Sequence, residues 1–370
     1  MHQILQQISE AGTSIWLDDL SRERLIKDGK SRNLQHLIES ENVVGVTTNP
    51  AIFAAAIANS DLYASDISQL SSKGLNAEAI INELTTADVY KACQLLLPAY
   101  EASGGKDGRV SIEVDPRFAR DTDATIQQAR ELWTKVNQPN LLIKVPATVE
   151  GIPAIRTLIS EGISVNVTII FSVTRYREVL EAFIAGLEDR QAKSLPVRDI
   201  HSVASFFVSR VDTDIDPKLR AHSNPTAQQL LGKAAIANAR LAYQHFAEIS
   251  NSARWQQLAA AGAAIQRPLW ASTGVKDPAY HPTVYVLELI APHTVNTMPE
   301  PTLIAVRDQG TFNGDTVTAH YSSAAQTLQA LLELGIDIED VASRLEIEGI
   351  EKFIKPWLEL IDTVERASRR

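Results

Sequence analysis

Short apolar segments recur along the chain and alternate with longer stretches whose apolar positions follow a helical period. Each segment is a few residues long, rich in β-branched residues and apolar on both faces, which is typical of strands in a buried parallel sheet. Seven of them lie at residues 15–17, 43–46, 109–114, 140–145, 165–171, 204–211 and 268–272. This alternation predicts repeated β-α-β units.

The eighth strand is less obvious from hydrophobicity. Residues 285–290 are apolar, but they begin about a dozen residues after the seventh segment, too soon for a crossover helix between parallel strands. We therefore predict a helix over residues 282–290 and the eighth strand over residues 294–298. Eight strands with intervening helices predict an α/β fold, the (β/α)8 TIM barrel.

Two further helical regions extend this plan. One covers residues 59–102, between the second and third strands, and the other begins with residues 318–334. The last helix has an apolar face formed by Ile350, Phe353, Ile354, Trp357, Leu358 and Ile361. Pro356 should kink this helix. We expect one domain over residues 1–370, with the helices of about 318–370 packed on the outside.

Composition and charge narrow the class of protein. Of the 370 residues, 45% are hydrophobic and 22% are charged, and the formal net charge is -10, which favours a globular protein over a nucleic-acid or membrane-surface binder. The single cysteine, Cys93, excludes an intrachain disulfide and a thiolate metal cluster. Residues 1–10 lack the features of a secretory signal and no apolar run could span a bilayer, so we expect a cytoplasmic enzyme. The sequence carries no indication of an oligomeric state.

Polar side chains within or just after the predicted strands are the candidates for chemistry. In a TIM barrel the catalytic residues lie at the carboxyl ends of the strands. The candidates are Asp18, Asn49, Glu113, Lys144, Asn166, Thr168, Ser205, Arg210 and Ser272.

Lys144 is the most informative of them because it interrupts an otherwise apolar strand, Leu-Leu-Ile-Lys-Val-Pro. Lysine is rarely buried without a partner or a function. In one interpretation it ends the strand with its amine in water or paired with Glu113 or Asp18. In the other it is a nucleophile that forms a Schiff base, because apolar surroundings favour the neutral form of an amine.

Two carboxylates accompany this lysine. Asp18 is either a helix N-cap or an acid/base group, and Asp19 is the better placed cap, which leaves Asp18 free. Glu113 would lie on the strand next to Lys144. It either neutralises that lysine or passes protons through a water while an imine forms and hydrolyses.

The remaining candidates suit substrate binding. Asn49 and Asn166 could hold hydroxyl groups, although single asparagines are common in turns. Arg210, Ser272 and Lys276 could form an anion site, a common feature near the last strands of this fold. The eight histidines form no metal motif, and no nucleotide-binding glycine pattern occurs, so we expect carbonyl chemistry without a metal or a cofactor.

Seven blocks of sequence match one known family, in order, over most of the chain. They are GVTTNPAIF at 45–53, SIEVDPR at 111–117, NLLIKVPAT at 140–148, VNVTIIFS at 165–172, ASFFVSR at 204–210, LWASTGVK at 269–276 and TVNTMP at 294–299. With these blocks the chain resembles transaldolase in its longer-chain bacterial form, a family of TIM-barrel enzymes that act through a lysine Schiff base.

The resemblance implies a role for each matched position. Lys144 corresponds to the Schiff-base lysine, Asp18 to the acid/base aspartate, and Glu113 with Thr168 to the pair that holds a catalytic water. The implied contacts to the dihydroxyacetone unit and to phosphate are Asn49, Asn166, Ser205, Arg210 and Ser272. Shorter relatives carry Ser-Phe-Arg where this chain has Ser-Thr-Gly at 272–274, so a second phosphate arginine is absent and Lys276 is the candidate replacement.

The resemblance also implies a reaction. The family moves a dihydroxyacetone unit from sedoheptulose 7-phosphate or fructose 6-phosphate to glyceraldehyde 3-phosphate or erythrose 4-phosphate in the non-oxidative pentose phosphate pathway. An aldolase that uses the same lysine and releases dihydroxyacetone is one alternative. A barrel that binds sugar phosphates without catalysis is the other, and the combination of Lys144, Asp18 and Glu113 argues against it.

Overall fold

Eight parallel strands close into a barrel in chain order, so the predicted TIM barrel is confirmed. The computed structural model describes residues 2–26 and 32–369. The strands are β1 (Thr13–Leu17), β2 (Val43–Val46), β3 (Arg109–Glu113), β4 (Leu141–Pro146), β5 (Val165–Ile170), β6 (Ser202–Phe207), β7 (Arg267–Ala271) and β8 (Thr294–Met298). Their side chains are almost all buried, as expected for strands with helices outside and a filled barrel inside.

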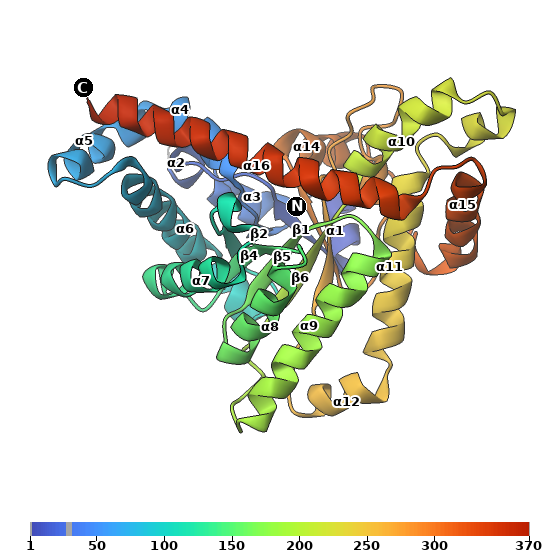
Figure 1. The fold of residues 1–370 in the computed structure, drawn as a ribbon, viewed down its shortest axis with the longest axis horizontal. Helices are drawn as coiled ribbons and strands as arrows, with labels where there is room; N and C mark the ends of the chain where they lie inside the picture. The colour runs from blue at the N-terminus through green and yellow to red at the C-terminus, as the bar shows by residue number, and fades with distance from the viewer. Residues whose placement is uncertain (1, 27–31, 370) are drawn as a thin grey trace.

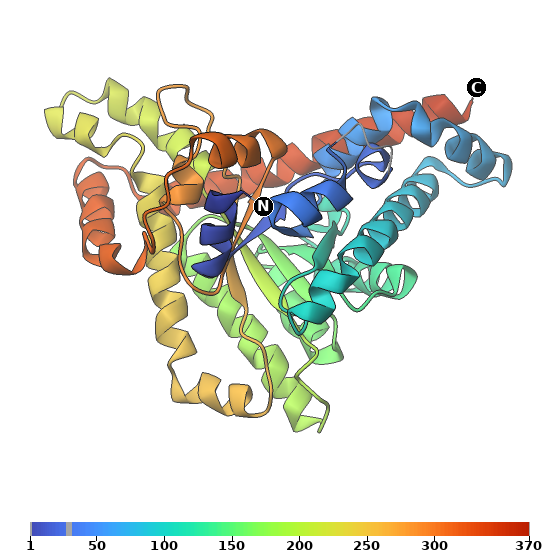
Figure 2. The same ribbon diagram turned by 180° about the vertical axis from the view of Figure 1, so that it is seen from behind.

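Helices surround the barrel and cover one of its ends (Figure 1). They are α1 (Gln3–Glu10), α2 (Arg22–Leu25), α3 (Leu34–Glu41), α4 (Pro50–Ala58), α5 (Ala64–Ser72), α6 (Ala77–Ala102), α7 (Thr122–Val136), α8 (Gly151–Glu161), α9 (Val173–Ala192), α10 (Ser209–Ala221), α11 (Ala234–Ser250), α12 (Ala253–Ala260), α13 (Val284–Leu287), α14 (Glu300–Gln309), α15 (Tyr321–Glu333) and α16 (Ile338–Ser368). The reverse view shows α1, dark blue at the N label, which packs on β1 and α14 (Figure 2). Among the described residues, no helix is both long enough and apolar enough to cross a bilayer.

Several predicted boundaries differ from the observed ones for local reasons. The predicted eighth strand at 294–298 is confirmed, but the helix before it shrinks from residues 282–290 to the single turn of α13. Residues 226–264 are alanine-rich and helical in pattern, yet they do not form one helix, because Gly232 adopts a left-handed conformation (φ +67°) ahead of α11 and Ser252 caps a separate helix, α12.

Two expectations about individual residues are wrong. The sixth predicted segment, 204–211, stops being a strand at Phe207, so Arg210 lies in the first turn of α10 rather than in β6. Asp19 does not cap the following helix. The cap of α2 is Ser21, whose hydroxyl accepts a hydrogen bond from the Arg24 amide, and Asp19 forms an ion pair with Arg24 instead.

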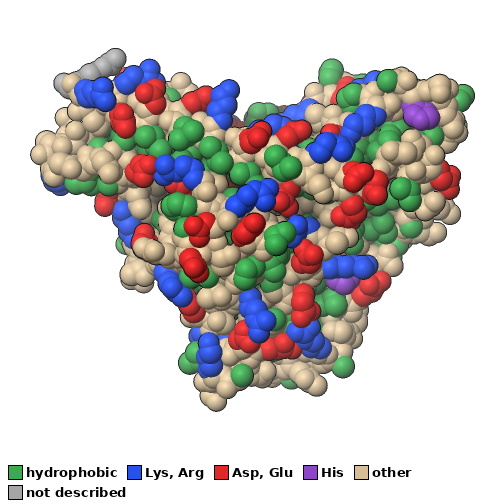
Figure 3. All heavy atoms as spheres, in the orientation of Figure 1, with side chains coloured by type: hydrophobic (Ala, Val, Ile, Leu, Met, Phe, Trp, Pro, Cys, Tyr) green, Lys and Arg blue, Asp and Glu red, His purple; other side chains and the backbone are tan. Residues whose placement is uncertain are grey.

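The last helix, α16, crosses the carboxyl end of the barrel. It runs, red in Figure 1, from α15 on one side to α4 and α5 on the other, packs on α6, α10 and β5, and continues through Pro356. Glu346 of this helix pairs with Arg120 and Arg175, and Arg344 pairs with Asp214. Basic and acidic side chains are interspersed over this face of the molecule (Figure 3). The helix therefore lies over the end of the barrel where the candidate residues gather.

Candidate active site

Lys144 and Glu113 form an ion pair inside the barrel. The parallel register of β3 and β4 sets the two residues side by side, and Lys144 Nζ lies 3.1 Å from Glu113 Oε2. Only 5% of either side chain is exposed. Lys144 Nζ also donates a hydrogen bond of 3.1 Å to the carbonyl oxygen of Thr48, after β2. The predicted pairing is confirmed, and the amine is fixed from two directions.

Asp18 brings a second carboxylate to this amine. It follows β1 directly, and its Oδ1 accepts a hydrogen bond of 2.7 Å from the hydroxyl of Thr47. Burial raises the pKa of the Asp18 carboxyl above its usual value, and the positive charge of Lys144 partly offsets this effect. The pKa of Glu113 is raised by burial in the same way and lowered in part by Lys144. Both carboxylates thus hold protons more readily than usual, and the charge of Lys144 acts on both, although of the two only Glu113 is in contact with it.

A chain of hydrogen bonds fixes the next part of the barrel interior. Asn166 of β5 lies beside Lys144 in register, and its Nδ2 donates to Ser111 Oγ over 2.9 Å. The Ser205 hydroxyl donates to Asn166 Oδ1 over 2.7 Å. Because the amide is held at both ends by β3 and β6, its orientation is set before any ligand binds.

The end of β5 is irregular where it carries Thr168. The register with β6 shifts between Val167 and Ile170, and Ile169 has φ +56°, a left-handed conformation that β-branched residues rarely adopt. The buried Thr168 hydroxyl has no hydrogen-bond partner among the described residues. It is thus available to a water or a substrate.

Ser209, the residue before Arg210, contacts Ser272 where β6 and β7 end. The Ser209 amide donates to the Ser272 carbonyl over 3.0 Å, and the hydroxyls of these two serines are also 3.0 Å apart. The Arg210 guanidinium lies 5.1 Å from the ring centroid of Phe207, and its buried Nη1 has no hydrogen-bond partner among the described residues. A half-buried cation with an unpartnered, buried N–H group is suited to binding an anion.

Asn49 and Lys276 have weaker links to the group around Lys144 than the other candidates. The Asn49 side-chain oxygen accepts a hydrogen bond from the Ile52 amide and caps α4, so the residue begins a helix rather than forming the predicted turn. Asn49 also lines a cavity next to Glu113. Lys276 is exposed in the loop after β7 and lines a different cavity, beside Arg220. No hydrogen bond or ion pair of the described residues joins Lys276 to the group around Lys144.

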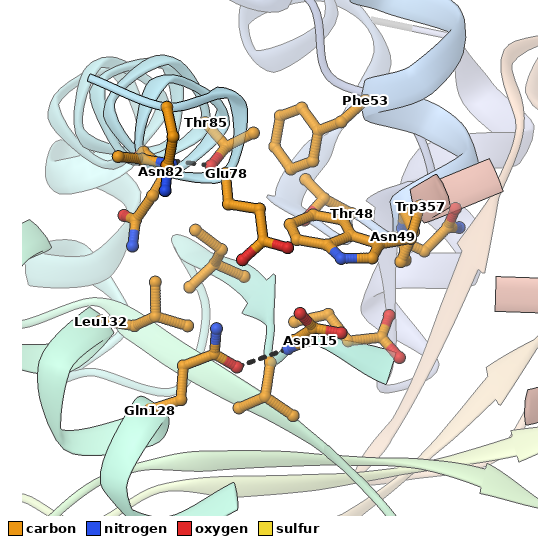
Figure 4. A pocket seen from close by; sticks show the side chains of 16 residues that line it. Thr48, Asn49, Phe53, Glu78, Asn82, Thr85, Asp115, Gln128, Leu132 and Trp357 are labelled. Carbon is orange, nitrogen blue, oxygen red and sulfur yellow. Dashed lines mark hydrogen bonds between the residues drawn. The ribbon is translucent and has the colours of Figure 1, made fainter. Parts of the chain in front are cut away.

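A cavity of about 260 Å³ opens beside the ion pair. Figure 4 shows Glu78 of α6 and Trp357 of α16 pointing into it from different elements, with Asn49 close to the indole. The buried Trp357 Nε1 has no hydrogen-bond partner among the described residues, so this cavity offers an unused donor of its own.

Three side chains near the site are absent from the sequence-based candidates. Thr47 holds Asp18, Phe353 of α16 places its ring centroid 5.5 Å from Lys144 Nζ and 5.9 Å from the Arg210 guanidinium, and Trp357 lines the cavity. The apolar face of α16 predicts that Phe353 and Trp357 are buried. Nothing in that periodicity says which surface they cover.

Comparison with known proteins identifies the family. The model described as transaldolase/fructose-6-phosphate aldolase matches residues 15–364. The transaldolase of Thermobifida fusca is 55% identical over 360 residues, 97% of either chain, and that of Mycolicibacterium smegmatis is 54% identical over 361 residues, 98% of this chain and 96% of the relative. The transaldolase of an Arthrobacter species is 55% identical over 362 residues, again 98% and 96%. The chain therefore belongs to the transaldolase/fructose-6-phosphate aldolase family.

Proposed function

We propose that the chain is a transaldolase that uses Lys144 as its Schiff-base nucleophile. It transfers a dihydroxyacetone unit from sedoheptulose 7-phosphate or fructose 6-phosphate to glyceraldehyde 3-phosphate or erythrose 4-phosphate, the transferase reaction of the non-oxidative pentose phosphate pathway. The observation that carries the residue assignment is the enclosed amine of Lys144, which contacts Glu113 and whose charge also acts on Asp18. A lysine in this setting has a proton acceptor in contact and little water around it.

Imine formation begins with a proton transfer. Glu113 accepts a proton from Lys144, and the neutral amine attacks the ketone carbon of the donor sugar. The carbonyl oxygen takes up two protons, one from the attacking nitrogen and one returned by Glu113, and leaves as water, which gives the protonated imine. A water held by Glu113 and the free hydroxyl of Thr168 relays these protons and later returns to hydrolyse the product imine.

Carbon–carbon cleavage follows from the electron demand of the imine. Asp18 removes the proton of the C4 hydroxyl, the C3–C4 bond breaks, and its electron pair moves toward the imine nitrogen. An aldose phosphate departs, and three carbons stay bound to Lys144. The same steps run in reverse when a second aldehyde is attacked, with Asp18 returning the proton to the new hydroxyl.

Substrate binding divides between a neutral and a charged part. Asn49, Asn166 and Ser205 hold the hydroxyls of the three-carbon unit, and the existing bond between the last two supports their joint orientation. Arg210 and Ser272 bind the phosphate, and the unpartnered Nη1 of Arg210 supports this. The exposed position of Lys276 gives no support to a place for it in the phosphate site.

The position of Phe353, on the helix that covers the site, distinguishes the transferase from its alternatives. An aldolase must protonate and release the three-carbon unit, whereas a transferase must keep water from it. The ring of Phe353 over Lys144 supports retention, and hence transfer. A barrel that binds sugar phosphates without catalysis has no use for an enclosed amine at this position.

Borohydride trapping tests the proposal. The chain is mixed with fructose 6-phosphate, reduced and digested, and the modified peptide is located by mass spectrometry. A three-carbon adduct on Lys144 is expected, with none in the Lys144→Met variant. An adduct on another lysine, or no adduct in an active preparation, would falsify the assignment.

A further inference from the structure

A cluster of basic side chains lies at the end of the barrel opposite Lys144. We call Lys106, Arg109, His201, Arg267 and His293 the amino-end basic cluster. Arg109 and Arg267 are the first residues of β3 and β7, and the other three lie in the turns that enter β3, β6 and β8. All five line a cavity of about 300 Å³. Because Glu113 ends the strand that Arg109 begins, this cavity is separated from the candidate active site by the length of the barrel.

Arg109 and Arg267 form the floor of the cavity, and each has N–H groups that make no hydrogen bond within the described residues. Arg109 is 1% exposed and Arg267 is 6% exposed. The Arg109 donors go to the carbonyl oxygens of Gly105 and Pro139, which carry no charge. Each guanidinium donates three hydrogen bonds among the described residues, so two of its five N–H groups are left for a ligand.

Positive charge at this end exceeds negative charge. The carboxylate paired with the cluster is that of Asp107, 2.9 Å from Arg267, which leaves Lys106 and Arg109 without an acidic partner among the described residues. Burial, Arg109 and Arg267 lower the pKa of His201 to about 3, so this histidine adds a neutral ring rather than a further charge. Three cations against one carboxylate leave two positive charges around the cavity.

The cavity is also open and partly apolar. Lys106 and His293 are exposed at its rim, whereas the arginines are buried at its floor. Leu142, Val203 and Ile265 line the remaining wall. A ligand that enters here meets positive charge first and then a carbon surface beside the guanidinium groups.

We propose that this cavity binds a phosphate group, either inorganic phosphate or the phosphate of a small monoester. The two guanidinium forks offer paired N–H groups to its oxygens, Lys106 and His293 approach from the rim, and the apolar wall accommodates the carbon part of a monoester. Such a ligand would join the starts of β3 and β7 and neutralise charge that the protein itself leaves unbalanced.

Calorimetric titration at constant ionic strength tests this proposal. Arg210→Ala serves as the starting chain, so that phosphate binding in the candidate active site is weakened. Inorganic phosphate and glycerol 3-phosphate are titrated into Arg210→Ala, into Arg210→Ala with Lys106→Ala, and into Arg210→Ala with His293→Ala. Arg210→Ala with Lys73→Ala is the matched control, because Lys73 is an exposed lysine at the end of α5.

The expected result is one phosphate site in Arg210→Ala that Lys106→Ala weakens by about tenfold and the control leaves unchanged. His293→Ala should weaken it as well. Tighter binding of glycerol 3-phosphate assigns the site to a monoester, and equal or weaker binding assigns it to inorganic phosphate. If Arg210→Ala binds neither ligand, or if Lys106→Ala binds both as well as the control does, the proposal is overturned.

Discussion

Lys144 Nζ and Glu113 Oε2 are 3.1 Å apart on neighbouring strands, in a space that water hardly reaches. If Glu113 takes the proton of this amine, Glu113→Gln should keep the fold and slow imine formation. We expect the rate of imine formation, measured by single-turnover borohydride trapping, to fall by about 10²-fold. Glu351→Gln, an exposed change on α16, should have no effect. Equal trapping rates in the two variants would show that the ion pair is only structural.

Asp18 should separate cleavage from imine formation. In Asp18→Asn the Thr47 hydrogen bond can persist, so Lys144 should still be trapped by borohydride while turnover falls by about 10³-fold. Because burial raises the pKa of Asp18, its carboxylate destabilises the folded state at neutral pH, and the variant should melt at a higher temperature at pH 7. A variant that turns over normally would remove Asp18 from the acid/base role.

Arg210 should distinguish phosphorylated from unphosphorylated sugars. Its free Nη1 predicts that Arg210→Ala raises KM for fructose 6-phosphate by about 10- to 100-fold and leaves KM for fructose little changed. Steady-state kinetics with both sugars measure this. Equal effects on the two substrates would place the phosphate elsewhere.

Phe353 should control the ratio of release to transfer. Phe353→Ala opens the space above Lys144 to water, so the release of dihydroxyacetone in the absence of an acceptor should rise several-fold relative to transfer. Leu358→Ala, an exposed apolar change on the same helix, is the control. An unchanged ratio would mean that α16 does not protect the bound intermediate.

Asp212 predicts a pH dependence of stability. It accepts hydrogen bonds from the Tyr285 hydroxyl and the Ala235 amide, and burial raises its pKa to about 7. Because the pKa of Asp212 in the folded state lies above its ordinary value of 3.8, the free energy of unfolding decreases as pH rises from about 4 to about 7. Asp212→Asn should therefore be more stable than the parent at pH 8, by on the order of 1 kcal/mol, and nearly equal at pH 4. Urea unfolding at both pH values provides the comparison.

The strands and the candidate side chains could be predicted from the sequence, because a buried parallel strand is a short run of apolar residues. A polar residue such as Lys144 inside one is conspicuous, and strand register then brings Glu113 beside it without further information. The boundary at Phe207 was less accessible, since Val208 and Val211 extend the apolar pattern after the chain has turned into α10.

The position of α16 over the site could not be predicted from its hydrophobic periodicity. The apolar face of α16 predicts burial of Phe353 equally well against the side of the barrel and across its end. Ion pairs between residues distant in sequence, such as Glu346 with Arg120 and Arg175, hold α16 across the end of the barrel. The left-handed Ile169 is also invisible beforehand, because a β-branched residue carries no preference for that conformation.

The helix that covers Lys144, α16 (Ile338–Ser368), follows all eight strands of the barrel in the chain. During synthesis it therefore emerges after them, so the amine of Lys144 faces solvent until α16 docks. Each new molecule then matures in a single late event, the docking of α16. Deleting α16 would therefore arrest the enzyme at that immature stage while leaving all eight strands in the chain.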